Sequence, residues 1–254
     1  MITNKFSELA ERAGERYGLV LETWRSIFNR AVANARFGSP AVKNQALIEA
    51  YNVAHKHVDD ETERMRADLE QIALEARSAA LAVFSADDTS ELTDELTQHL
   101  NDCVEHLRSE YAIQIERDIA SLRKNLTITA LQISVSARAQ GVSRRNATLQ
   151  YQVGNSREMR FYFHDRANRK WPSRKYIRTI WRHELLDLYN DVVLATAAEY
   201  GAAELEVSHA HAKAGVHGKR LSLSYNSELP NYSEVKAEIF HPNSESILVP
   251  IVRP

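Results

Sequence analysis

Apolar side chains recur every three or four residues through the first half of the chain, and this spacing constrains the fold more than any other feature. The first run predicts one apolar stripe along a helix from about Asn4 to Phe37. Its members are Phe6, Ala10, Ala13, Tyr17, Val20, Trp24, Ile27 and Ala31. Gly38-Ser39-Pro40 follows and predicts the end of this helix, because proline cannot continue it.

Two further long helices are predicted by the same spacing. One runs from about Ala41 to Phe84, and we expect its acidic middle, beginning at Asp59-Asp60-Glu61, to form a solvated face. The next begins near Asp88, which with Glu91 resembles a capping box, and its apolar stripe includes Cys103 as a core residue. Long helices gain little stability from propensity alone, so residues 1–140 are predicted to form an elongated helical bundle or coiled coil.

The second half of the chain mixes helix and strand patterns. The stretch Leu126–Arg138 favours a strand but leaves a helix open, and the residues around Gly154-Asn155-Ser156 predict a β-hairpin. Ser173 is expected to cap a helix that reaches about Tyr200, where Gly201 ends it. Short strands are expected at 205–207, 221–223 and 247–252. The fold class is therefore α+β and predominantly helical, with a small α+β domain over residues 141–254.

Composition and charge exclude some classes of protein. No stretch approaches the roughly 20 apolar residues of a membrane span, and the first residues meet Glu8 and Glu11 without an apolar signal core. A single cysteine gives no disulfide framework and fits synthesis in a reducing cytosol. The net charge is only −2, yet residues 144–182 carry eleven basic and two acidic residues, a balance of +9 that leaves −11 for the rest. Such a separation concerns binding partners rather than the fold.

The basic segment suggests contact with DNA or with an acidic partner. Its cations are Arg144, Arg145, Arg157, Arg160, Arg166, Arg169, Lys170, Arg174, Lys175, Arg178 and Arg182. Aromatic residues are interleaved with them, namely Tyr151, Phe161, Tyr162, Phe163, Trp171, Tyr176 and Trp181. Such a pattern suits phosphates and stacked bases. The alternative is that the aromatic side chains form core and the cations pair with acidic residues of the N-terminal helices.

The sequence offers few candidates for catalysis. His209, His211, His217 and His241 are the candidate metal ligands, but no Cys-x-x-Cys or His-Glu-x-x-His pattern supports them, so no cofactor is expected. His241-Pro242-Asn243 is predicted to form a turn. His183 and Asp187 are expected to pair on one helix face, which is more ordinary than acid–base catalysis. We therefore expect no enzymatic activity.

Several short motifs follow one another in the last two fifths of the chain. Asp165 and Trp171 lie in a segment similar to "D-x-x-G-R-x-W", and Tyr176 and Arg178 open the helix after it. Gly218-Lys219 begins a stretch similar to "G-K-x-x-S-L". Phe240-His241-Pro242-Asn243-Ser244 is similar to "F-H-P-N-C", and Leu248-Val249-Pro250 closes the series. In this order, the motifs resemble the minor head proteins of the phage Mu F-like (head morphogenesis) family.

This resemblance implies a structural protein, present in few copies inside a phage head near the portal vertex and made in the host cytoplasm. It implies contacts with portal or major capsid protein and with double-stranded DNA, and we expect self-association through the N-terminal helices. Family members often carry cysteines where this chain has Ala210, Lys213 and Ser244, so a role of those cysteines does not transfer. Two alternatives remain open: a soluble DNA-binding protein that uses residues 144–182, and a metal-dependent hydrolase built on the histidines.

Overall fold

The computed structural model describes residues 2–86, 91–154, 159–224, 228–241 and 243–251. Backbone contacts divide the chain into two compact units. The sheet unit comprises Met1–Ala13, Glu61–Ser109 and Ile177–Pro254, and the hairpin unit comprises Gly14–Asp60 and Glu110–Tyr176. Each unit is described by itself below. The predicted domain boundary near residue 140 stays a prediction.

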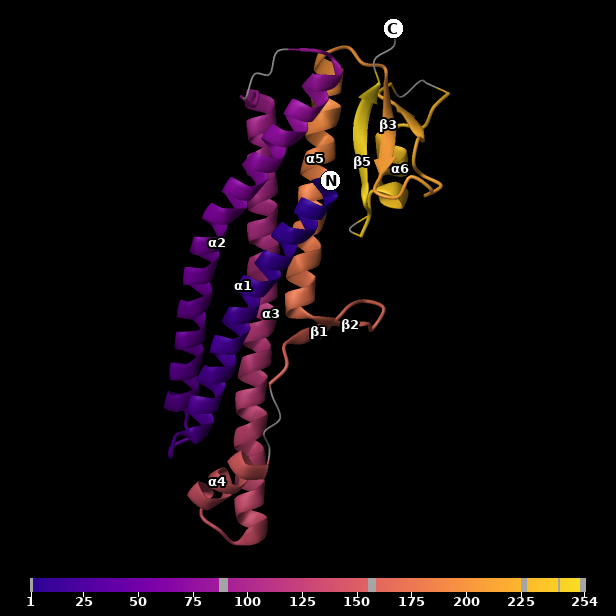
Figure 1. The fold of residues 1–254 in the computed structure, drawn as a ribbon. Helices are drawn as coiled ribbons and strands as arrows, with labels where there is room; N and C mark the ends of the chain where they lie inside the picture. Colours follow the sequence, from indigo (N-terminus) through magenta and orange to yellow (C-terminus); the bar gives the residue numbers. More distant parts are fainter. Residues whose placement is uncertain (1, 87–90, 155–158, 225–227, 242, 252–254) are drawn as a thin grey trace. The chain divides into compact units, whose positions relative to one another are not determined.

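The described residues form mostly helices, with short strands in both units (Figure 1). The fold is therefore α+β and predominantly helical, as predicted. The helices are α1 Ile2–Ala33, α2 Pro40–Val83, α3 Asp94–Gln140, α4 Arg144–Gly154, α5 Ser173–Glu199 and α6 Tyr232–Ile239. The strands are β1 Tyr162–His164, β2 Lys170–Pro172, β3 Glu204–His209, β4 Arg220–Ser222 and β5 Ser246–Ile251. None of the helices in the described part of the chain has the length and apolar character needed to span a membrane.

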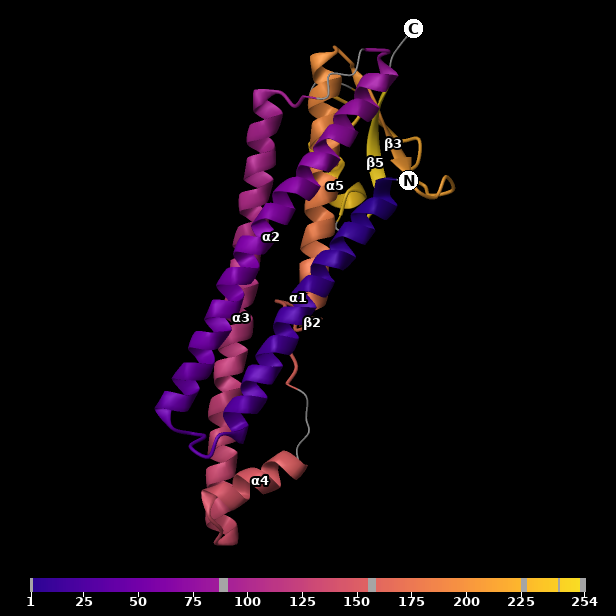
Figure 2. The ribbon, with the colours of Figure 1, turned by 60° about the vertical axis from the view of Figure 1, so that its left-hand side comes forward.

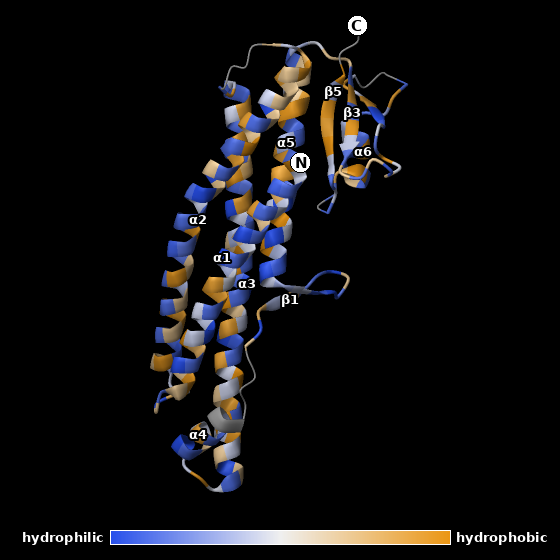
Figure 3. Cartoon of the chain, in the orientation of Figure 1, coloured by the Kyte–Doolittle hydropathy of each residue, from blue (hydrophilic) through white to orange (hydrophobic). Residues whose placement is uncertain are grey.

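The sheet unit contains a three-stranded antiparallel sheet in the order β4-β3-β5, which lies beside α5 (Figure 1). Apolar residues predominate along β5 (Figure 3), and alternate residues of this strand are buried. The side chain of Asn190 on α5 accepts a hydrogen bond of 2.8 Å from the backbone N–H of Leu248. On the helical side, Phe6 of α1 packs edge-on against Tyr189 of α5 at 5.7 Å between ring centroids.

The hairpin unit packs the later part of α1 and the earlier part of α2 against α3 (Figure 2). Trp24 of α1 is fully buried and donates a hydrogen bond of 3.0 Å to the carbonyl of Ala50 on α2. Its ring lies 5.7 Å from Phe161, which precedes the β1–β2 hairpin. Helix α4 folds back beside the C-terminal end of α3 in both views (Figures 1 and 2).

The structure decides one open assignment in this unit and overturns one prediction. Residues 126–138 take the helical alternative, because Leu126, Ile133 and Ala137 share one face of α3 and are buried, which overrides the strand preference of the β-branched residues. The hairpin predicted around Gly154-Asn155-Ser156 is wrong, since residues 149–153 lie in α4; Asn155 and Ser156 fall outside the described residues. The hairpin pairs β1 with β2 instead.

Most other predicted elements are confirmed within a few residues. Helix α5 starts at Ser173 as its first helical residue and ends before Gly201, which has φ +70°. Helix α3 begins at Asp94, with the hydroxyl of Thr93 accepting a hydrogen bond from the Leu96 N–H, while the predicted cap Asp88 falls outside the described residues. Cys103 is buried, as predicted. The acidic middle of α2 is only partly solvated.

The partial burial of the acidic middle of α2 has a local cause. Asp59 and Asp60 are exposed, but Glu61 is fully buried, with one carboxylate oxygen 3.4 Å from a nitrogen of Arg64. Glu61 occupies an inward position of α2, and Met65, one turn later, is buried on the same face.

Candidate functional site

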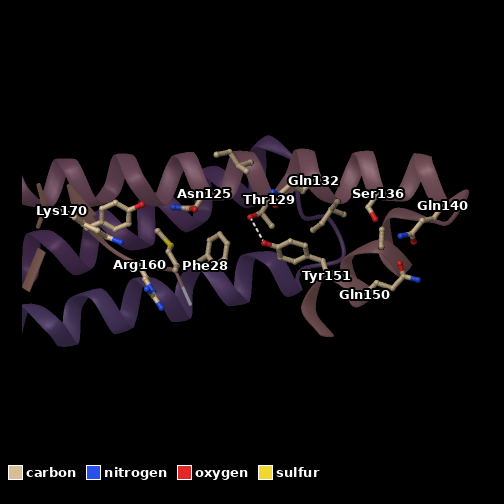
Figure 4. A pocket seen from close by; sticks show the side chains of 15 residues that line it. Phe28, Asn125, Thr129, Gln132, Ser136, Gln140, Gln150, Tyr151, Arg160 and Lys170 are labelled. Carbon is tan, nitrogen blue, oxygen red and sulfur yellow. Dashed lines mark hydrogen bonds between the residues drawn. The ribbon is translucent and has the colours of Figure 1, made fainter. Parts of the chain in front are cut away.

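The hairpin unit contains a groove of about 910 Å³ between α3, α4 and the segment that leads into β1 (Figure 4). Its lining residues are Phe28, Asn125, Ile128, Thr129, Gln132, Ile133, Ser136, Gln140, Ala147, Gln150, Tyr151, Met159, Arg160, Tyr162 and Lys170. The lining is rich in amide and hydroxyl side chains. Among these described residues none is acidic. The groove is therefore polar and, by its formal charges, cationic.

One face of α3 supplies the polar wall. Asn125, Thr129, Gln132, Ser136 and Gln140 follow one another at intervals of four, three, four and four residues, so they point to the same side of the helix. Figure 4 shows these side chains in a row along α3. We call this row the polar stripe. It exists because α3 continues as a helix through the stretch that the sequence pattern left ambiguous.

A second face of α3 beside the polar stripe is apolar and exposed. Ile128 is 40% exposed, Leu131 is 61% exposed and Val135 is 66% exposed. These three residues line a second, smaller cavity of about 390 Å³ together with Gln132 and Ser136. In the sequence, no Asp or Glu occurs from Ile119 to Arg157. This part of the hairpin unit therefore combines uncovered apolar side chains with an excess of positive charge.

Helix α4 forms the opposite wall of the groove. Ala147 is buried, which holds the helix in place, and Gln150 and Tyr151 line the groove. The hydroxyls of Tyr151 and Thr129 lie 3.4 Å apart and form a hydrogen bond across the groove (Figure 4). Thr129 is itself buried, so this contact ties α4 to the floor of the groove.

Two cations lie at the end of the groove near the β1–β2 hairpin. Arg160 and Lys170 are both exposed. The ammonium of Lys170 lies 3.8 Å from the ring centroid of Tyr162, which is 37% exposed. Tyr162 lies on the neighbouring strand two residues before His164, the residue directly opposite Lys170. A cation over an aromatic face is attracted by the ring quadrupole, so Tyr162 restrains the position of Lys170.

Asp165 organises the turn that carries Lys170. One carboxylate oxygen accepts hydrogen bonds of 2.9 Å from the N–H groups of Ala167 and Arg169. The other accepts from the Arg169 guanidinium at 2.7 Å and from the Trp171 indole at 3.0 Å. The backbone hydrogen bond from Arg169, followed by the side-chain donors, lowers the pKa of Asp165 to about 2. Asn168 takes φ +57° within the turn.

The remaining predicted cations that the structure describes do not line the groove. Arg174 and Arg178 lie near Glu15 and Glu11 of α1, at 3.7 and 2.7 Å, as the pairing alternative predicts. Lys175 lies over Trp171, Arg144 donates to Ser134, and Arg182 donates to the Ser244 carbonyl. Arg145 and Arg166 are exposed, and Arg157 falls outside the described residues.

The aromatic residues of this segment divide between core and surface. Phe161 and Trp181 are buried, as the core alternative predicts. Phe163 and Tyr176 are half-buried and pack edge-on at 5.2 Å, with the Arg117 guanidinium over both rings. The hydroxyl of Tyr176 donates to Glu110 of α3, and burial together with this bond raises the pKa of Tyr176 to about 12.

The candidate metal-ligating histidines make hydrogen bonds with the backbone. His217 Nδ1 accepts from the His209 N–H at 3.1 Å, and His209 Nδ1 accepts from the His211 N–H at 3.0 Å. His241 Nδ1 accepts from the Asn243 N–H at 3.3 Å, and its carbonyl accepts from Ser244 at 2.7 Å, which closes the predicted turn; Pro242 falls outside the described residues. Within the described ranges, no group of three or more His, Cys, Asp or Glu side chains is arranged to hold a metal.

The sheet unit gathers ionisable groups around the buried Glu184, and sequence reasoning mostly missed them. His106 of α3 lies 3.4 Å from Glu184 of α5, and His99 of α3 lies 3.2 Å from Asp191. Asp187 lies 3.6 Å from His183, which confirms the predicted helix pair, and also 3.3 Å from Lys236 of α6. We call these groups the ionisable cluster; apart from the pair on α5, no sequence spacing could have linked residues so far apart.

Burial and hydrogen bonding change the pKa of some groups in and beside the ionisable cluster. Burial raises the pKa of Glu184 to about 7, against the opposing influence of His106. The hydrogen bond to Asp191 raises the pKa of His99. Burial raises the pKa of the Cys103 thiol to about 12, which keeps this neighbouring thiol protonated near neutral pH.

A second buried network in the hairpin unit was also missed. Asp118 of α3 is 1% exposed and accepts hydrogen bonds from Tyr17 at 2.7 Å, from Ser173 at 2.8 Å and from Gln114 at 3.1 Å. Burial raises the pKa of Asp118, and these three donors oppose that effect. The network joins α1, α3 and the first residue of α5.

The remaining motif residues also lie at turns or beside them. Gly218 takes φ +77°, a conformation that favours glycine, and its N–H donates to the carbonyl of Val207. The carbonyl of the next residue, Lys219, accepts a hydrogen bond from the N–H of Val207.

Comparisons of this chain with protein-family models, with curated proteins and with solved structures find no match.

Proposed function

We propose that this chain is a non-enzymatic structural protein of a tailed-bacteriophage head, of the minor head protein type, that associates with the portal and the major capsid protein. One observation carries the proposal beyond the sequence resemblance. The motif residues Asp165, Gly218 and His241 each hold a turn through backbone hydrogen bonds or a left-handed conformation. Residues with such tasks suit an attachment module, whose motifs preserve the shape of its loops.

Exposed apolar side chains on α3 support a role in assembly. Ile128, Leu131 and Val135 present an apolar face that is uncovered within the described chain. Contiguous exposed apolar residues are characteristic of surfaces that bind other proteins. In this proposal the face contacts a neighbouring copy or another head protein.

Mass spectrometry of purified particles tests this proposal. Virions and proheads of a phage that encodes the chain are purified by density gradient, and the chain is quantified against the portal and major capsid proteins. We expect the chain to co-purify at far fewer copies than the major capsid protein. An abundant host cytosolic protein serves as the contamination control. Absence of the chain from both virions and proheads contradicts the proposal.

A second candidate function is favoured by the groove. A soluble DNA-binding protein that uses the basic segment would place cations away from carboxylates, and Arg160 and Lys170 lie in a groove whose described lining residues include no Asp or Glu. A salt titration of binding to duplex DNA tests this candidate, because release of counterions makes affinity fall steeply as salt rises. Failure to bind nucleic acid of any form at low salt removes this candidate.

A further inference from the structure

We propose that the groove of the hairpin unit binds a single-stranded segment of nucleic acid, with phosphates at Arg160 and Lys170 and unpaired bases along the polar stripe. The inference narrows the DNA-binding candidate to one site and one form of nucleic acid. Every group that the inference uses lies within the hairpin unit. The inference does not use the proposed role in a phage particle.

The charge of the groove selects an anionic ligand. Arg160 and Lys170 are exposed at one end, and the described lining residues include no Asp or Glu. Other cations of the same segment are engaged by carboxylates, as Arg178 is by Glu11 at 2.7 Å. Among the described lining residues, a phosphate would therefore meet positive charge and no acidic side chain.

The aromatic residues provide a surface on which a base can stack. Tyr162 lines the groove beside Lys170 and is 37% exposed. Tyr151 lies on the opposite side, where its hydroxyl is held by Thr129. Alternation of aromatic faces and cations is the usual design of surfaces that bind single strands, because every base has a flat face and every linkage has a charge.

The polar stripe suits the edges of unpaired bases. Gln132 and Gln140 of the stripe and Gln150 of α4 are exposed amides, and an amide can donate and accept hydrogen bonds at the same time. In a duplex the pairing edges of the bases are already engaged, whereas in a single strand they are free to meet these amides. A concave site of about 910 Å³ also admits splayed bases more readily than the convex outside of a duplex.

Fluorescence anisotropy with a labelled oligothymidylate of about 12 nucleotides, within the range bound by known single-strand modules, tests the inference. We expect the single strand to bind at least about tenfold more tightly than a duplex of equal length at low salt, since only its base edges are free. The slope of log affinity against log salt should fall by about 1.4 in the double variant Arg160→Gln/Lys170→Gln, because each lost phosphate contact removes about 0.7.

Matched variants locate the site. Gln132→Glu places a carboxylate in the groove, whereas Leu131→Glu places the same charge on the adjacent exposed residue that does not line it. We expect the first to weaken binding at least about tenfold and the second less than about threefold, because repulsion between charges falls with distance and is screened by salt. Arg145→Gln/Arg166→Gln removes two exposed cations outside the groove and is the control for the double variant. Circular dichroism confirms that each variant is folded.

Four results would overturn the inference. Duplex bound as tightly as the single strand keeps the DNA-binding candidate but rejects the groove as a single-strand site. Equal loss in the groove variants and in their controls assigns binding to the general positive charge. If polyglutamate displaces the labelled oligothymidylate as well as an unlabelled single strand does, the groove fits an acidic protein segment better than a nucleic acid. No binding of either form of DNA removes the inference and the DNA-binding candidate together, while the proposed role in the particle is still tested by its own experiment.

Discussion

Each unit of the protein buries a carboxylate on α3 or beside it, but the two carboxylates have different partners. Asp118 of the hairpin unit is surrounded by neutral donors, the hydroxyls of Tyr17 and Ser173 and the amide of Gln114. Glu184 of the sheet unit faces His106 and lies within the ionisable cluster. The difference teaches that one helix can support a carboxylate held by neutral donors and another carboxylate whose pKa burial raises to about 7.

The largest effect is expected where the neutral network is broken. Asp118→Ala removes a buried acceptor and leaves the donors of Tyr17, Ser173 and Gln114 without it. We expect the free energy of unfolding to fall by about 3 kcal/mol, because buried donors without acceptors are costly. Urea unfolding followed by circular dichroism measures this change.

Tyr17→Phe is the graded control for that variant. It removes one donor and keeps Asp118 bonded to Gln114 and Ser173, so the expected loss is about 1 kcal/mol. If both variants lose less than this amount, Asp118 is not the centre of a stabilising network, and the comparison between the two units fails on this side.

A smaller effect, but one that depends on pH, is expected for the ionisable cluster. The pKa of Glu184 is about 7 in the folded chain and lies near the ordinary value when unfolded, so the folded state binds the proton more tightly. Stability is therefore greatest at low pH within this range and is lost as pH rises through 7. The raised pKa of His99 acts in the same direction. From about pH 5 to about pH 8 we expect a loss of about 2 kcal/mol, measured as a falling thermal midpoint.

Glu184→Gln identifies the source of that pH dependence. The amide keeps the shape of the side chain but does not titrate, so the slope of stability against pH should flatten. Glu105→Gln changes an α3 carboxylate in the same unit that is 67% exposed, and it should leave the slope as in the unchanged protein. A wild-type slope in Glu184→Gln would show that other groups dominate and would remove the contrast between the units.

The smallest effect is expected at two glycines that follow helices, one in each unit. Gly38 takes φ +91° and Gly201 takes φ +70°. A methyl group would meet only ordinary contact at Gly38 and open space at Gly201. Gly38→Ala and Gly201→Ala should therefore each cost about 1 kcal/mol from backbone strain alone. Because no charge is involved, both losses should be equal at low and high pH; unequal losses would show that the two units differ in more than their ionisable groups.

The long helices and the short C-terminal strands could be predicted because their signals are local. The stripe from Phe6 to Ala31 has the period of a helix, and Gly201 marks the end of α5 through its backbone alone. The segment 126–138 could not be assigned with the same rules, because its β-branched residues favour a strand while its burial against neighbouring segments requires a helix. Packing against residues that are distant in the sequence therefore decides between helix and strand for residues 126–138.

The candidate site was only partly accessible to sequence reasoning. Arg160 and Lys170 belong to the predicted basic segment, and they do line the groove. The polar stripe was missed because its residues are individually unremarkable amides and hydroxyls, and only a continuous helix brings them to one side. Asp118 and Glu184 were missed because their partners lie far away in the sequence, as Tyr17 does from Asp118.

Strand β2 runs directly into α5, so Lys170 precedes Ser173 by only three residues. Ser173 is anchored to Asp118 through its hydroxyl, and the intervening Pro172 restricts the backbone. Lys170 is therefore only three residues away from a backbone position that is held inside the hairpin unit. A molecule that binds Lys170 in the folded protein therefore raises the free energy of unfolding of the hairpin unit. By the same linkage, a change that loosens the Ser173–Asp118 contact weakens binding at Lys170 by the coupling free energy.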